Sequence, residues 1–68
     1  MKTINGQAIG DRLKSLRGNK SQKEVADALG VTPVAISQYE RGERIPNDDM
    51  KIAIAKYFRK SVATIFFN

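Results

Sequence analysis

The sequence predicts an all-α fold, a compact bundle of five short helices, and three observations support this prediction. Apolar residues recur three and four positions apart, which is the spacing of helices that bury one face, and no segment alternates as a β-strand does. Residues that cap helix N-termini precede these apolar stretches, and glycines follow several of them. The 68 residues suffice for one small domain. We therefore predict a single domain spanning residues 1–68.

The first helix is predicted from roughly Gln7 to Arg17. Ile9, Leu13 and Leu16 recur at intervals that place them in one apolar stripe along its length. Gly18 and Asn19 follow the last turn, and both residue types end helices readily.

The second helix is predicted to begin after Ser21, whose side chain can cap its N-terminus. Glu24 stands three residues later, so the two residues form a predicted capping box. Gly30 can adopt a positive φ, and it therefore ends this helix abruptly. The inward-facing residues predicted for the helix are Val25, Ala26 and Leu29.

The third helix follows almost at once, with Thr32 as its cap and Pro33 at the first helical position, where a missing N–H costs nothing. Ile36 and Tyr39 face the core, and Gly42 stops the helix. The second and third helices thus form a tight helix-turn-helix. An exposed helix in that motif fits the major groove of B-DNA. The residues left facing outward are Pro33, Val34, Ser37, Gln38 and Arg41.

Two further helices complete the prediction. Asn47 caps a fourth helix that ends at about Arg59, and Ser61 caps a short final turn. The predicted apolar residues are Met50, Ile54 and Phe58 on the fourth helix and Val62, Ile65 and Phe66 on the fifth.

Composition and charge narrow the possible functions. Lys and Arg number 12 against 7 Asp and Glu, giving a net charge of +5 that attracts polyanions such as nucleic acid. The chain has neither Cys nor His, which excludes disulfides, the usual zinc sites and the commonest acid–base catalyst. No apolar run is long enough to cross a membrane. We expect a cytoplasmic protein without enzyme activity, cofactor, metal or small-molecule ligand.

Several residues in one register carry a family resemblance. The residues are Gln22, Ala26, Gly30, Ile36 and the run Glu40-Arg41-Gly42, followed by Arg44, Pro46 and Ile54-Ala55-Lys56. With this pattern, the chain from about Ile9 to Phe67 resembles the lambda-repressor-like helix-turn-helix family, also called the Cro/repressor-type or XRE family. The resemblance implies a transcriptional regulator that binds double-stranded DNA. The chain departs from the family at Arg59-Lys60, where a glycine and an apolar residue are common.

The predicted roles follow from side-chain chemistry and from the resemblance. Gln38 can donate to and accept from adenine at once, serine can bind several base edges, and valine can pack only on a thymine methyl group. The predicted base-reading residues are Gln38, Ser37, Val34 and Pro33, although Pro33 also has a sufficient role in starting its helix. The predicted backbone contacts are Gln22, Lys23, Thr32, Arg41 and Arg44. By resemblance, Glu40 forms a structural ion pair with Arg17.

Two exposed apolar residues raise the question of a partner. Ile52 falls opposite Ile54 on the helical wheel, and Phe67 follows the inward Phe66. These residues could form a two-fold interface, as the region around the last two helices does in the family, or they could be ordinary scattered surface residues. We expect a homodimer, at least on DNA, that binds a palindromic operator. Since no effector domain follows the fifth helix, we expect a repressor rather than an activator.

Two other function classes remain. A protein-interaction module, such as an antirepressor or antitoxin-type partner, could use the same fold and surface against protein. The glutamine and arginine on the outward face favour DNA, whereas an acidic or apolar face would favour protein. An enzyme is a more distant hypothesis, because Asp, Glu, Ser or Lys would have to gather in a pocket for which so small a chain has little room.

Overall fold

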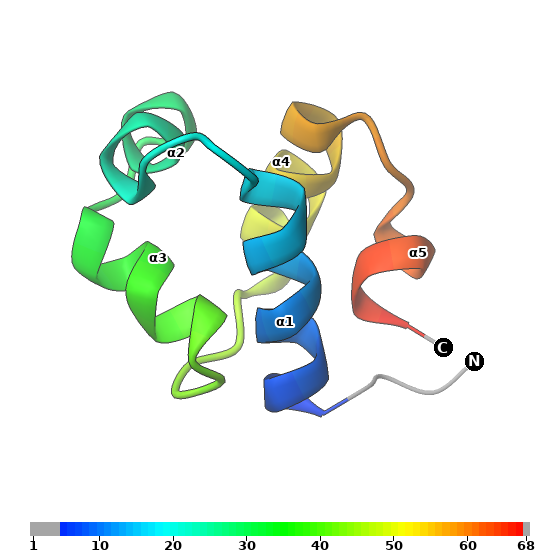
Figure 1. The fold of residues 1–68 in the computed structure, drawn as a ribbon. Helices are drawn as coiled ribbons and strands as arrows, with labels where there is room; N and C mark the ends of the chain where they lie inside the picture. The colour runs from blue at the N-terminus through cyan, green and yellow to red at the C-terminus, as the bar shows by residue number, and fades with distance from the viewer. Residues whose placement is uncertain (1–4, 68) are drawn as a thin grey trace.

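The computed structural model describes residues 5–67 as five α-helices, with no β-strand in that range (Figure 1). Their bounds are α1 (Gly6–Arg17), α2 (Gln22–Leu29), α3 (Pro33–Glu40), α4 (Asp48–Phe58) and α5 (Val62–Phe66). In Figure 1, α1 runs through the middle of the bundle, with α3 on one side and α5 on the other. The all-α prediction is confirmed, and each predicted helix is present.

Each helix begins at a side chain that accepts a backbone N–H three residues later. The caps predicted at Ser21, Thr32, Asn47 and Ser61 are all present, and Asn5 caps α1 in the same way. The capping box predicted at Ser21 is only half formed. The Glu24 N–H donates to Ser21 Oγ at 3.0 Å, but the Glu24 carboxylate points away from Ser21 and returns no bond. The prediction was wrong in that half, and a single bond fixes this helix start.

The core is drawn from all five helices. Leu16, Leu29, Met50, Phe58 and Val62 pack against it but stay partly exposed, because a domain of this size has few fully enclosed positions. Ala35, which the periodicity did not single out, is buried. The buried apolar residues are Ile9, Leu13, Val25, Ala26, Ala35, Ile36, Tyr39, Ile54, Ala55, Ile65 and Phe66.

The turn between α2 and α3 has the geometry that the sequence predicts. Gly30 adopts the left-handed conformation, with φ 72° and ψ 30°, and its N–H donates to the carbonyls of Ala26 and Asp27. The Val31 N–H also donates to the Ala26 carbonyl, at 3.0 Å. These bonds satisfy carbonyls at the end of α2 and hold the start of α3 close to it.

The contact between α1 and α3 depends on Gly10. A Cβ atom at this position would lie 2.3 Å from the carbonyl oxygen of Glu40 and 2.8 Å from that of Tyr39. Both are backbone atoms, so a side chain here would force the two helices apart. The buried glycine therefore sets how closely α1 approaches the end of α3.

The junction of α4 and α5 holds the one non-glycine residue with a positive φ among residues 5–67. Arg59 has φ 57° and ψ 44°, so it adopts the left-handed stop for which the family often uses glycine. Arg12 of α1 reaches the other end of α5, where its Nη1 donates to the Thr64 carbonyl at 2.7 Å. The short last helix is thus tied to α4 at its start and to α1 at its end. None of the helices in residues 5–67 has the length and apolarity needed to cross a membrane.

Candidate nucleic-acid interface

Helix α3 has one buried side and one exposed side. Ala35, Ile36, Tyr39 and Glu40 are buried, whereas the Val34 side of the helix faces solvent, with Val34 itself 63% exposed. Residues three and four positions apart share a side of a helix, so the outward residues predicted from the sequence form one row. Pro33, Val34 and Arg41 are exposed, and Ser37 and Gln38 are half-buried.

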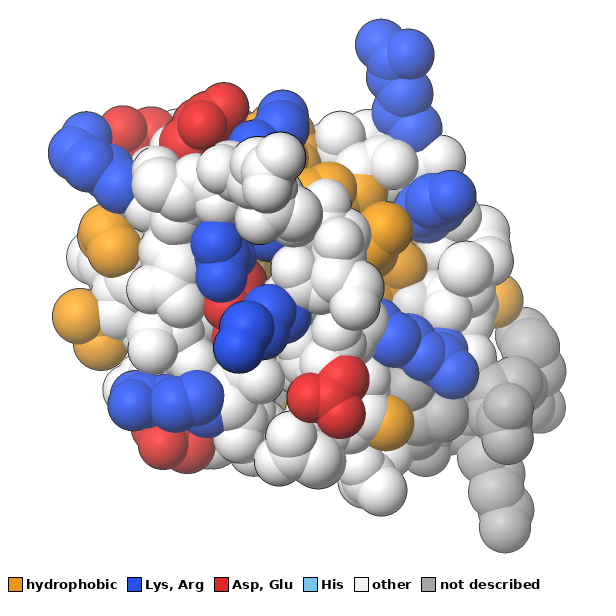
Figure 2. Space-filling model, in the orientation of Figure 1, with side chains coloured by type: hydrophobic (Ala, Val, Ile, Leu, Met, Phe, Trp, Pro, Cys, Tyr) orange, Lys and Arg blue, Asp and Glu red, His pale blue; other side chains and the backbone are white. Residues whose placement is uncertain are grey.

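Cationic side chains flank this row. Figure 2 shows Lys and Arg distributed across the face where α1, α2 and α3 meet, with acidic side chains between them. Lys23 pairs with Asp27 at 2.8 Å, and this hydrogen bond together with the carboxylate charge raises the pKa of Lys23 above its ordinary value. Arg41 pairs with Glu43 at 3.2 Å. Exposed pairs of this kind contribute little to stability, so either cation can exchange its carboxylate for another anion.

Two predicted backbone contacts, Arg44 and Thr32, lie close to the ends of α3. The guanidinium carbon of Arg44 is 5.7 Å from the centre of the Tyr39 ring, a cation–π distance that orients an otherwise exposed side chain. Thr32 Oγ1 accepts the Ala35 N–H at 3.1 Å, which leaves the hydroxyl hydrogen able to donate.

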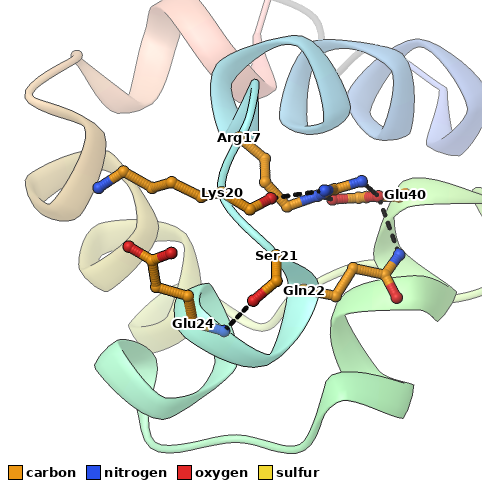
Figure 3. A network of polar contacts seen from close by, with 6 residues as sticks. All are labelled: Arg17, Lys20, Ser21, Gln22, Glu24 and Glu40. Carbon is orange, nitrogen blue, oxygen red and sulfur yellow. Dashed lines mark hydrogen bonds and ion pairs between the residues drawn. The ribbon is translucent and has the colours of Figure 1, made fainter.

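The structure brings Arg17 and Glu40 together as a bidentate ion pair (Figure 3). Arg17 Nε lies 2.6 Å from Glu40 Oε2, and Nη2 lies 3.0 Å from Oε1. The side chains are 17% and 5% exposed. Hydrogen bonding to Glu40, reinforced by the carboxylate charge, raises the pKa of Arg17 against the opposing effect of burial. Arg17 Nη1 also donates to the Lys20 carbonyl at 2.7 Å, so one guanidinium joins α1, α3 and the α1–α2 loop.

Sequence reasoning missed a third partner of this pair. Gln22, predicted only as a backbone contact, is half-buried, and its Nε2 donates to Glu40 Oε1 at 3.1 Å. Glu40 therefore accepts bonds from α1 and from α2 at once. Sequence spacing alone cannot identify a contact between residues of two different helices, because the contact depends on how the helices cross.

The groove between α1 and α5 and the acidic side chains of residues 5–67 add no further site residue. A groove of about 390 Å³ between α1 and α5, lined in part by Leu16 and Ile65, contains none of the predicted site residues. Within residues 5–67, no three Asp or Glu side chains gather closely enough to hold a metal ion. Apart from Arg17 at the end of α1, the predicted site residues lie on α2, on α3 and in the loops that flank them.

Comparisons with known structures agree with this arrangement. The P22 c2 repressor, in a crystal structure with synthetic operator 9T, is 33% identical, with a TM-score of 0.82 over 87% of this chain and 92% of that one. The clp gene regulator ClgR from Corynebacterium glutamicum is 27% identical, with a TM-score of 0.78 over 94% and 86%. The SOS-response repressor LexA from Eubacterium rectale is 25% identical, with a TM-score of 0.82 over 96% and 72%.

The family comparison covers most of the chain. No curated protein sequence matches it. The model of the helix-turn-helix family HTH_3 matches residues 13–65, which include the end of α1, all of α2, α3 and α4, and most of α5. The chain therefore belongs to the HTH_3 helix-turn-helix family, as the resemblance to Cro/repressor-type proteins predicts.

Proposed function

We propose that this protein represses transcription by binding a palindromic DNA operator as a homodimer, with α3 in the major groove. The family and its neighbours support the broader class, a DNA-binding transcriptional regulator rather than an enzyme. The observation that carries the finer proposal is the division of α3, whose inner side is buried while Val34 on its outer side is 63% exposed. A helix held in this way can enter a groove without unfolding.

Base reading is assigned to the outward row of α3. The Gln38 amide can pair with N6 and N7 of adenine, and the Ser37 hydroxyl can donate to or accept from a base edge. Val34 offers only methyl groups, so we expect it to pack on thymine. Pro33 adds an apolar contact at the start of the helix. With these residues α3 would discriminate by hydrogen bonds near its middle and by apolar contact near its N-terminus.

Backbone binding is assigned to the ends of α2 and α3. Gln22 and Thr32 stand where the free N–H groups of a helix N-terminus favour a phosphate. Lys23, Arg41 and Arg44 add positive charge on either side of the row. These contacts carry no sequence information, but they fix the protein on the duplex and make the affinity depend on salt.

Dimerisation is assigned to the side of the bundle that carries Ile52. This residue is 47% exposed on α4. Phe67 was predicted to be exposed as well, but it is partly buried and packs against the core. Ile52→Asp is therefore the cleaner test. We expect it to remain folded and to lose cooperative binding to two half-sites about 34 Å apart, as followed by sedimentation and by DNA titration.

Selection of bound sequences from a random DNA pool tests the function itself. An enriched palindrome would support a dimeric operator-binding protein. An enriched sequence without two-fold symmetry would retain DNA reading and remove the dimer. If no sequence is enriched at low salt, where backbone contacts are strongest, the protein-interaction module becomes the better hypothesis.

A further inference from the structure

Glu40 is a buried acid in an unfavourable place. It lies at the last position of α3, where the helix dipole disfavours negative charge, and its side chain is 5% exposed. The bidentate bond from Arg17 balances its charge. That ion pair leaves one contact unexplained, the hydrogen bond that Glu40 Oε1 accepts from Gln22 Nε2 at 3.1 Å.

The Gln22 contact fixes which way round the glutamine amide lies. An ionised carboxylate only accepts hydrogen bonds, so it can face the NH₂ group of an amide but not its oxygen. Figure 3 shows the Gln22 nitrogen turned toward Glu40 and the amide oxygen turned away. The nitrogen carries two hydrogens, and Glu40 takes one, which leaves the second able to donate. Without Glu40, both orientations of the amide would be open to it.

Gln22 is also placed where an anion is favoured. It is the first residue of α2, and Ser21 caps the helix by accepting the N–H of Glu24. The N–H groups of Gln22 and Lys23 have no hydrogen-bond acceptor among residues 5–67. A phosphate here would meet backbone donors, the helix dipole and a glutamine N–H together.

We propose that Glu40 is a positioning residue for DNA binding, which holds the Gln22 amide with an N–H ready for a backbone phosphate. The inference rests on the proposed function, because it assigns a partner to Gln22. It gives a negative charge near DNA a favourable effect on affinity. Charge alone has the opposite effect, since an acid near phosphates weakens binding.

The difference in sign makes the proposal testable with four variants and with two combinations of them. Glu40→Met removes the carboxylate with little change of volume, and Gln22→Ala removes the amide. Arg17→Met/Glu40→Met replaces the whole ion pair by apolar side chains, an exchange that buried pairs often tolerate, and it guards against misfolding of the single variant. Glu43→Met is the matched control, because it removes an exposed acid that pairs with Arg41 just beyond the same end of α3.

Affinity is measured on a short random-sequence duplex at fixed low salt, with the folded fraction of each variant determined by circular dichroism. We expect Gln22→Ala to weaken binding about tenfold or more, because the hydrogen bond that it removes has a charged acceptor. Glu40→Met should weaken binding as well, whereas Glu43→Met should strengthen it. In both backgrounds that lack Glu40, the further change Gln22→Ala should weaken binding less than it does in the wild-type chain, because the amide there is no longer held with its N–H outward. If Gln22→Ala costs the same with and without Glu40, or if Glu40→Met strengthens binding as Glu43→Met does, the proposal is wrong.

A readout without DNA separates this inference from the proposed function. In nuclear magnetic resonance spectra of the free protein, one Gln22 side-chain amide proton should be shifted downfield and exchange slowly with solvent, and Glu40→Met should abolish both effects. Two ordinary amide signals in the wild-type chain would overturn the positioning role. If the wild-type chain does not bind any duplex, the proposed function fails, whatever the amide signals show.

Discussion

Two turns of this molecule have nearly the same backbone. Gly30 between α2 and α3 has φ 72° and ψ 30°, and Arg59 between α4 and α5 has φ 57° and ψ 44°. In each turn the next N–H donates to a carbonyl of the preceding helix, from Val31 at 3.0 Å and from Lys60 at 2.9 Å. A hydroxyl residue then caps the following helix in both.

The helices that follow these two turns differ in length and in how much of their surface is exposed. Helix α3 has eight residues and keeps one side exposed, with Val34 at 63%. Helix α5 has five residues, and its Ile65 and Phe66 are 1% and 0% exposed. The turn geometry therefore does not distinguish the helix proposed to read DNA from a structural one. Both helices supply core residues, but α3, which buries Ala35, Ile36 and Tyr39, also keeps a second side that the core does not use.

The largest expected effect comes from truncating one side chain on each of these two helices. Phe66→Ala should reduce the free energy of unfolding by about 3–5 kcal/mol, because it empties a fully enclosed core position. Val34→Ala on α3 should change it by less than about 0.5 kcal/mol, because the side chain touches little. Urea denaturation of both variants checks this. A loss at Val34 comparable to the loss at Phe66 would mean that the outer side of α3 is not free of the core.

The next effect concerns what holds α3 in place. Removing either Arg17 or Glu40 should cost about 3 kcal/mol or more, since the partner is left charged and largely buried. Arg17→Met, Glu40→Gln and the double variant form a double-mutant cycle, measured by thermal unfolding. A coupling energy below about 0.5 kcal/mol would show that the pair does not act as a unit. Helix α5 has no such ion pair among residues 5–67 and is tied by the Arg12 bond to its carbonyls instead.

The sequence predicts the helix starts after both turns and the glycine end of α2, but it does not predict the left-handed conformation of Arg59, where the family's glycine is missing. Helix starts are predicted correctly at Ser21, Thr32 and Ser61, because capping requires only a side chain and a backbone N–H three residues apart. Gly30 predicts a helix end for an equally local reason, which is that glycine adopts the left-handed conformation without strain. The outward row of α3 follows from helical periodicity once the inward residues are known.

Features that depend on the crossing of helices could not be predicted. In the sequence, nothing marks Gly10 as a packing residue. Only the close approach of the Glu40 carbonyl shows why a side chain is excluded there. Arg12 reads as a surface cation, yet it caps the far end of α5. The Gln22–Glu40 contact is of the same kind. A glycine within a helix is the one signal that could have been followed further, because it costs about 1 kcal/mol and so calls for a packing reason.

A third prediction separates reading from anchoring on the exposed side of α3. Gln38→Ala should weaken binding to the selected operator by roughly 1–3 kcal/mol and hardly affect random DNA, because it removes contacts to one base pair. Arg44→Ala should weaken both and reduce the salt slope by about one unit, because it removes one phosphate contact. Fluorescence anisotropy at several salt concentrations measures both. Equal losses on the two DNAs for Gln38→Ala would remove its role as a reader.

The smallest expected effect concerns the two turns, where similar backbones carry glycine at position 30 and arginine at position 59. Arg59 carries a Cβ in the left-handed region, which costs about 1–2 kcal/mol, and glycine would avoid this at the expense of about 0.5–1 kcal/mol of unfolded-state entropy. Arg59→Gly should therefore stabilise the fold by about 0.5–1 kcal/mol. Gly30→Ala should do the reverse and cost about 1 kcal/mol, since its Cβ would meet nothing within 4 Å and only the backbone is strained. Arg59→Ala keeps the strain while removing the charge, so it should leave the melting temperature unchanged. If Arg59→Ala stabilises as much as Arg59→Gly, the gain comes from removing a cation near Lys60 and Lys56, and the two turns differ in charge rather than in strain.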